Sequence, residues 1–310
     1  MTVFFRLSKI IMAINYSKPP LTIEEQLKKF IKRGLIVSDE VNATKTLSSI
    51  GYYRLSGYLH PLRERDAKGL VLDKFVDNSN WNTALTLYEF DRKLRLLVLD
   101  ALERVEVAIR CQLVYHFSHS YGPFGYTKSI NFHEAFNHEF WLTGITKETN
   151  RSSEAFIKHY QSKYEGYPEL PLWMLAEVLS LGSLSYAYGG LKNDDKKVIS
   201  SYFNVHHKSL SDWLHSLSYI RNVCAHHSRL WNRKLSIRIE AIKNPPWTPA
   251  IKPRNDRIFC IILILKHLLV ATGNNKEWVV NLRDLIRPIA KDDRWRNAMG
   301  LPSDWETYLQ

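Results

Sequence analysis

Residues 84–118 read ALTLYEFDRKLRLLVLDALERVEVAIRCQLVYHFS, and this stretch decides the fold that the sequence predicts. Its apolar side chains recur mostly at steps of three and four residues, at Leu87, Phe90, Leu94, Leu97, Ala101, Val105, Ala108 and Leu113. Such spacing is typical of a helix that buries one side, and neither glycine nor proline interrupts it. We therefore expect a single helix of roughly nine turns, which Gly122-Pro123 ends.

Helical patterns also flank this segment. Thr22-Ile23-Glu24-Glu25 has the form of a capping box, and Pro171 suits the first turn of another helix, in which Gly182 and Ser183 allow close packing. Ser209 and Asp212 are expected to cap a helix that ends near Cys224. Further helices are expected near residues 194–203, 255–271 and 275–289.

The segments together predict an all-α fold built around a bundle of long helices, because no stretch alternates in the manner of a strand. We divide the chain into an N-terminal extension (1–17), an N-terminal helical segment (18–83) and a helical core (84–310). The core contains a poorly periodic insertion near 119–168, with a short helix near 152–163, and a proline-rich stretch at 244–253.

Composition narrows the range of partners. The chain has 310 residues and a net charge of +12, which favours a polyanion such as nucleic acid. Three cysteines without CxxC spacing argue against disulfides and structural zinc, so we expect a reducing, cytoplasmic setting. The most apolar run, 259–265, is too short to cross a bilayer and predicts a buried helix, so no membrane partner is expected.

The chemistry concentrates in Arg221-Asn222-Val223-Cys224-Ala225-His226, which His227 follows. Histidine exchanges protons near neutral pH, and arginine binds phosphate oxygens with a planar fork of donors. We interpret His226 as a general acid or base and Arg221 as the group that stabilises transition-state charge, with Asn222 and His227 in support. Attack by an RNA 2′-hydroxyl would then give a 2′,3′-cyclic phosphate without a metal or cofactor.

A structural alternative remains open for this motif. Arginine and histidine at a helix C-terminus often interact with the last carbonyls and the helix dipole. In a straight helix, moreover, Arg221 and His226 point about 140° apart. A loosened helix end, or a second copy of the motif across a two-fold axis, would bring the groups together.

Other residues carry paired interpretations. Glu106 and Arg110 predict either a helical ion pair or a support that orients Arg221 or His226. Arg54, beside Tyr52 and Tyr53, is a candidate for RNA binding or belongs to a segment that packs in the core. RNA contacts or a solvated charged turn are the alternatives for Arg229, Arg233 and Lys234.

A zinc site is the remaining possibility that the histidines raise. His206-His207, Cys224 and His226-His227 could in principle gather around one ion. They lack the spacing of structural zinc ligands, so no metal is expected.

From about Lys18 to the end, the chain resembles the Abi-like abortive-infection family of bacteria (AbiD/AbiF type), within the HEPN superfamily of helical ribonuclease domains. The residues that carry the resemblance are Lys18-Pro19-Pro20-Leu21-Thr22, Glu24-Glu25-Gln26, Arg33-Gly34-Leu35, 51–58, Asp91, Leu94-Arg95, 102–107, Pro171-Leu172-Trp173, Glu177, 182–185, 221–226, 229–233 and 299–302.

The HEPN motif is an arginine, four to six residues and a histidine, which Arg221 and His226 match. The resemblance implies a homodimer in which two motifs form one metal-independent site. It also implies a ribonuclease toxin of phage defence, held in check by an inhibitory RNA or protein antitoxin. Two alternatives stay open: a non-catalytic RNA-binding regulator and a protein-interaction subunit.

Overall fold

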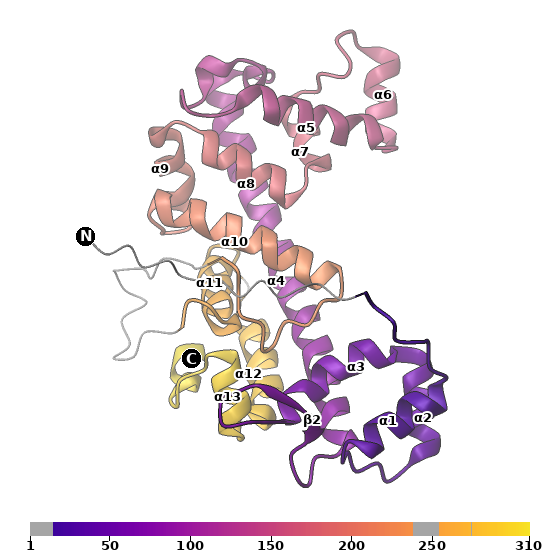
Figure 1. Cartoon of the computed structure of the whole chain (residues 1–310). Helices are drawn as coiled ribbons and strands as arrows, with labels where there is room; N and C mark the ends of the chain where they lie inside the picture. The colour runs from indigo at the N-terminus through magenta and orange to yellow at the C-terminus, as the bar shows by residue number, and fades with distance from the viewer. Residues whose placement is uncertain (1–14, 238–253, 274) are drawn as a thin grey trace, which may run out of the picture. The chain divides into compact units, whose positions relative to one another are not determined.

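Helices dominate the computed structural model of the chain (Figure 1). It describes residues 15–237, 254–273 and 275–310, and the expected proline-rich stretch and most of the N-terminal extension lie outside these ranges. The described residues form thirteen α-helices and one two-stranded sheet, which confirms the all-α class. The chain divides into two compact units between Tyr88 and Glu89.

The first unit contains three helices and a hairpin before the longest helix begins. Its elements are α1 (Ile23–Lys32), α2 (Glu40–Ile50), α3 (Tyr52–Leu59), the 3₁₀ turn η1 (His60–Leu62), β1 (Arg63–Arg65) and β2 (Val71–Phe75). The predicted capping box is present, because the Thr22 hydroxyl accepts from the Glu25 N–H at 3.2 Å and the Thr22 N–H donates to Glu25 at 2.8 Å.

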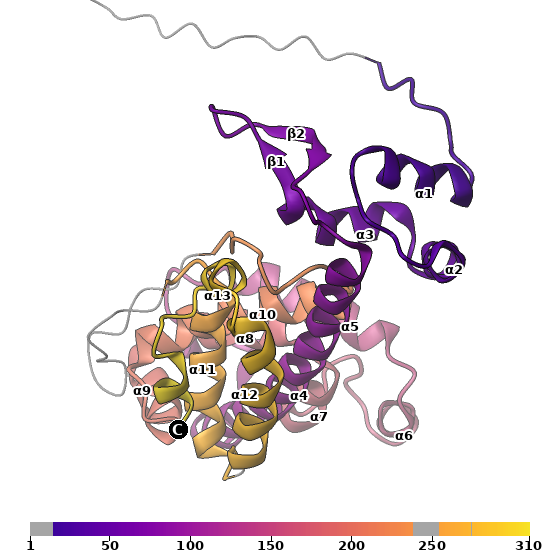
Figure 2. The same cartoon turned by 90° about the horizontal axis from the view of Figure 1, so that it is seen from below.

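The antiparallel hairpin of β1 and β2, visible in Figure 2, was not predicted. Four of the five residues of β2 are exposed, so its sequence lacks the alternation that marks a half-buried strand. Arg63 stabilises the pair from β1, donating to the Leu72 carbonyl at 2.7 Å and to Asp73 at 2.6 Å.

The longest helix, α4 (Trp81–Tyr121), has 41 residues and confirms the predicted long helix. It ends where expected, with Gly122 at a φ of 80° that suits glycine. The second unit continues with α5 (His138–Arg151), α6 (Ala155–Lys163), α7 (Leu172–Val178), α8 (Leu181–Gly190), α9 (Asn193–Tyr202), α10 (His207–Ala225), α11 (Ile258–Ala271), α12 (Lys276–Ala290) and α13 (Asp293–Met299), and with the 3₁₀ turns η2 (Gly125–Thr127), η3 (Ser129–Asn131) and η4 (Trp305–Leu309).

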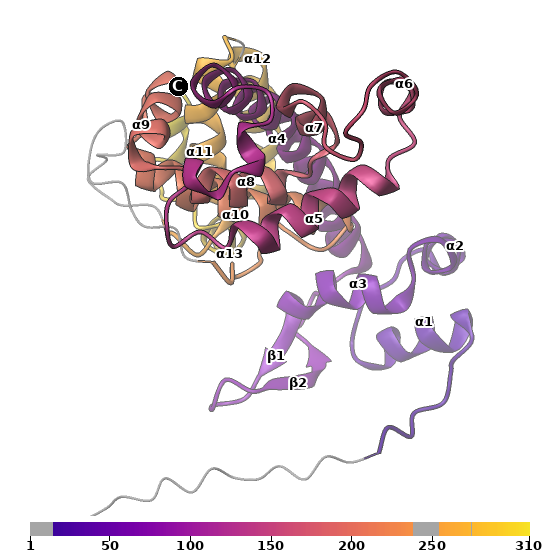
Figure 3. The ribbon, with the colours of Figure 1, turned by 90° about the horizontal axis from the view of Figure 1, so that it is seen from above.

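The core of the second unit forms around α10 and α11. α8 packs so closely on α10 that a Cβ atom on Gly182 would lie only 3.3 Å from the Ser218 hydroxyl. Figure 3 shows α5 on the outer side of α8. α11 buries the whole predicted run 259–265, and α12 is tied to α4 where the Trp278 indole donates to the Leu97 carbonyl at 2.8 Å. In the described ranges, no helix combines the length and hydropathy that a membrane span requires.

The observed helices differ from the prediction in three respects. α10 begins at His207, with His206 at its N-cap, so Ser209 and Asp212 already lie in its first two turns. The predicted helix after Pro171 is broken at Leu179 and Ser180, whose extended backbone separates α7 from α8. In the insertion, α6 matches the expected short helix, whereas α5 was missed, as was α13 near the C-terminus.

Candidate functional site

The Arg221–His226 motif occupies the C-terminal end of α10, which finishes in a tight backbone turn. The N–H groups of His226, His227 and Ser228 donate to the carbonyls of Asn222, Cys224 and Val223 at 3.0, 3.0 and 2.9 Å. His227 has a φ of 55°, so the turn is a Schellman motif with a histidine at the left-handed position.

This turn bears on the structural alternative for the motif. The carbonyls of Asn222, Val223 and Cys224 accept backbone N–H groups, so these three do not depend on the side chains of Arg221 or His226 for hydrogen bonds. The side chain of His226 is exposed and that of Arg221 is half-buried. Both are therefore within reach of a polyanion at the surface of the second unit.

Asn222 is a hydrogen-bond partner of Arg221. Its side-chain oxygen accepts from the Arg221 guanidinium at 3.3 Å, and its own side chain is exposed. Because α10 ends at Ala225, the His226 backbone (φ −86°, ψ 14°) departs from helical geometry. The motif thus places one guanidinium, one amide and one imidazole at the C-terminal end of α10.

Glu106 is a half-buried carboxylate on α4. It forms the expected i,i+4 ion pair with Arg110 at 2.9 Å, and the two side chains are only 17% and 15% exposed. Burial raises the pKa of Glu106, while the positive charges of Arg110 and Arg221 oppose that rise. The helical ion pair is therefore present, and a role of Glu106 in orienting Arg221 or His226 stays a prediction.

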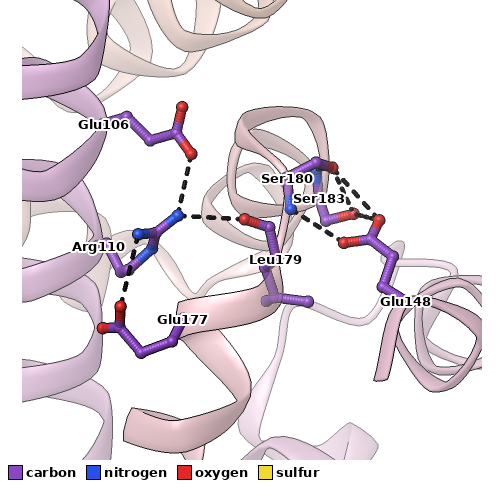
Figure 4. Close-up of polar contacts among 7 residues, drawn as sticks. All are labelled: Glu106, Arg110, Glu148, Glu177, Leu179, Ser180 and Ser183. Atoms are coloured by element: carbon purple, nitrogen blue, oxygen red, sulfur yellow. Dashed lines mark hydrogen bonds and ion pairs between the residues drawn. The ribbon is translucent and has the colours of Figure 1, made fainter. Parts of the chain in front are cut away.

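Arg110 connects this pair to the break between α7 and α8 (Figure 4). Its guanidinium donates to the Leu179 carbonyl at 3.2 Å and lies 3.9 Å from the Glu177 carboxylate. A side chain of α4 therefore fixes the residue at which the helical backbone stops. Sequence reasoning treated Arg110 only as the partner of Glu106.

Glu148 of α5 fixes the other side of the same break (Figure 4). It accepts the Ser180 N–H at 2.9 Å and the hydroxyls of Ser180 and Ser183 at 3.3 and 2.5 Å. Ser180 in turn caps α8 by accepting from the Ser183 N–H at 3.2 Å. Because α8 packs on α10, the contacts that hold the break also help to hold the helix that carries the motif.

A second carboxylate of α4 holds the chain that follows the motif. Asp91 is fully buried, pairs with the buried Arg95, and accepts the backbone N–H groups of Leu230 and Trp231 at 3.1 and 2.7 Å. Sequence analysis noted Asp91 and Arg95 only as points of resemblance. Asp91 determines where the chain goes after the Schellman turn.

The basic residues after the motif have different surroundings. Arg233 donates to the Arg229 carbonyl at 2.9 Å and to the Tyr219 hydroxyl at 3.3 Å, so it stabilises this loop. Arg229 is half-buried and Lys234 is exposed. Lys234 is thus the most accessible of the three for an RNA backbone.

The tyrosine-rich segment belongs to the first unit, and most of it packs internally. Tyr52 stacks on Phe30 with ring centroids 4.4 Å apart, and Tyr58 is buried against Tyr88. Tyr53 and Arg54 are exposed on α3. Of the predicted stacking cluster, these two alone offer an accessible surface.

The residues considered for zinc do not converge. His206 and His207 lie at the start of α10, whereas His226 and His227 follow its end, roughly 28 Å away along a helix of this length. Cys224 is buried, and burial raises the pKa of its thiol to about 12. Within the described part of the chain, no three His, Cys, Asp or Glu side chains form a group that could hold a metal ion.

Comparison with known families gives one result that covers the motif and its supports. The family model described as "Abi-like protein" matches residues 45–232, which include α4, the break between α7 and α8, and all of α10. No curated protein matches the chain, and neither does a solved structure. Because the match covers more than half of its length, the chain belongs to the Abi-like protein family.

Proposed function

We propose that the protein is a metal-independent endoribonuclease of abortive infection and cleaves RNA at the end of α10. The observation that carries this proposal is that the half-buried Arg221 and the exposed Asn222 and His226 lie together at the end of α10, where three carbonyls accept backbone N–H groups. Membership of the Abi-like family supports a role in phage defence.

The chemistry follows from the groups available. The His226 imidazole removes the proton of a ribose 2′-hydroxyl, or protonates the departing 5′-oxygen, because histidine side chains can act as general bases and general acids. Arg221 stabilises the charge that develops on the phosphate oxygens, and Asn222 orients its guanidinium. The products are a 2′,3′-cyclic phosphate and a 5′-hydroxyl.

One imidazole cannot serve as base and acid in the same step, so we propose a homodimer that pairs two motifs. The exposure of His226 on each chain supports this arrangement. A toxin of this kind acts on RNA in the cytoplasm and needs restraint, which an inhibitory RNA or protein antitoxin would supply. The net charge of +12 favours an acidic or nucleic-acid inhibitor.

The decisive experiment incubates the purified full chain with single-stranded RNA in EDTA and identifies the RNA ends. We expect cyclic-phosphate products from the wild type and a loss of about 10²–10⁴-fold in His226→Ala, the usual contribution of a general acid or base. His206→Ala is the matched control, because His206 is also exposed but lies at the opposite end of α10.

Two outcomes would contradict the proposal. Undiminished cleavage by a folded His226→Ala variant would remove His226 from the mechanism. Salt-sensitive RNA binding without cyclic-phosphate products would favour the RNA-binding regulator instead.

A further inference from the structure

A groove lies between α4 and α7 in the second unit, with a volume of about 580 Å³. Its lining combines aromatic, aliphatic and polar groups, among them Val107, Arg110, Tyr115, His119, Trp173 and Glu177. Tyr115 is 64% exposed and Trp173 is 49% exposed, so both rings present accessible surface to the groove. The rings of Tyr115 and His119 lie 4.3 Å apart on neighbouring turns of α4.

One end of the groove adjoins the candidate catalytic motif. Arg110 lines the groove and donates to the Leu179 carbonyl at 3.2 Å, at the break before α8. Gly182 of α8 packs against Ser218, which lies about one turn before Arg221 on α10. The groove therefore ends at the junction that supports the C-terminal turns of α10, where Arg221 lies. A flexible polymer whose phosphate contacts Arg221 could place its next group in the groove.

We propose that this groove binds an unpaired nucleobase of the RNA that the enzyme cleaves. The inference rests on the proposed function and specifies its substrate as single-stranded RNA with an accessible base near the scissile phosphate. Partly exposed Trp and Tyr rings are the surfaces on which proteins stack unpaired bases.

The polar lining favours a base over an apolar protein side chain. Glu177, whose side chain is 59% exposed, offers a carboxylate that accepts from the amino or imino groups of a base. Arg110 supplies a guanidinium at the end of the groove that meets the α7–α8 break, and α8 packs on α10 about one turn before Arg221, where the RNA phosphates would be. A nucleobase has a flat ring for the aromatic side chains, a polar edge for Glu177 and a linked phosphate for the end near Arg110.

The first test measures RNA binding with a cleavage-inactive background. Full-length His226→Ala binds a fluorescent single-stranded RNA, and His226→Ala/Trp173→Ala is expected to bind it about 5- to 150-fold more weakly, the range for loss of one stacked base. Trp173→Phe, which keeps a ring, should recover most of the affinity. Phe140→Ala is the matched control, since Phe140 is 66% exposed on α5 and does not line this groove.

The second test replaces single nucleotides of the RNA by abasic ones. At one position the abasic RNA should bind His226→Ala as weakly as the intact RNA binds the Trp173→Ala double variant. Combining the two changes should then add nothing further. Independent losses at every position would overturn the inference, even if the wild type cleaves RNA normally.

The same variants distinguish the remaining outcomes. If Trp173→Ala weakens self-association in sedimentation velocity but leaves RNA affinity unchanged, the groove is a contact between subunits and the inference fails. If His226→Ala binds no RNA, the inference and the proposed function both fail. Failure of cleavage alone, with base-dependent binding retained, would overturn the proposed function and leave the groove assignment standing.

Discussion

Two ion pairs on α4 share the same sequence spacing but have different surroundings. Asp91 and Arg95 are buried, and Asp91 also accepts two backbone N–H groups from the loop after the motif. Glu106 and Arg110 keep 17% and 15% of their side chains exposed, and Glu106 interacts with the charge of Arg221. The comparison shows that four-residue spacing predicts an ion pair in both places, whereas the burial of the pair and its other partners depend on long-range packing.

The largest effect is expected at the buried pair. Asp91→Ala leaves the Arg95 charge and two backbone N–H groups without their acceptor, so the free energy of unfolding should fall by about 3–5 kcal/mol. Urea unfolding of the full chain measures this. Glu89→Ala is the control, because its i,i+3 pair with Arg92 is exposed and should contribute at most about 1 kcal/mol. Equal losses in both variants would erase the distinction between buried and exposed pairs.

Arg110→Ala should reduce both stability and activity. It removes the partner of Glu106 and the donor to Leu179, at a cost of about 1.5–3 kcal/mol in unfolding free energy. RNA cleavage should fall roughly tenfold at saturating RNA, since a displaced Glu106 no longer holds Arg221 in place. Single-turnover rates measure this decrease.

The control for Arg110 is Arg104→Ala, which removes another i,i+4 ion pair of α4. Arg104 pairs with Asp100, whose side chain is 51% exposed. Cleavage by a stably folded Arg110→Ala variant at the Arg104→Ala rate would show that the Glu106–Arg110 pair does not support the site.

The smallest effect is a change in how stability depends on pH. Burial raises the folded-state pKa of Glu106 above its ordinary value of 4.5, so the folded chain holds this proton more tightly than the unfolded chain. The wild type should therefore lose stability relative to Glu106→Gln as pH rises from 4.5 through the folded-state pKa. Unfolding midpoints at several pH values test this, and a gain with rising pH would mean that Arg110 and Arg221 outweigh burial.

Local sequence rules predicted the elements that depend on nearby residues. The apolar periodicity of α4 and the Thr22–Glu25 capping box each lie within one continuous segment, so the sequence contains everything that specifies them. The break at Leu179–Ser180 is different, because its stabilising partners are Arg110 on α4 and Glu148 on α5. Such long-range contacts leave no periodic signal in the sequence.

The motif shows the same division between local and long-range information. Its residue types suggested the chemistry, and helical geometry raised the problem that Arg221 and His226 diverge. The Schellman turn was not predicted, because sequence rules look for glycine or asparagine at the left-handed position, which His227 occupies here. A role of Glu106 in orienting Arg221 is still one of two alternatives, since it depends on how α4 and α10 pack.

The left-handed backbone of His227 allows the effect of a mutation on folding to be separated from its effect on proton transfer. Glycine adopts this conformation without the penalty of roughly 1–2 kcal/mol that a Cβ atom brings. His227→Gly should therefore raise the melting temperature slightly while deleting one of two adjacent imidazoles. A variant that is more heat-resistant and still cleaves would assign proton transfer to the other ring, with no loss of folding to confuse the result.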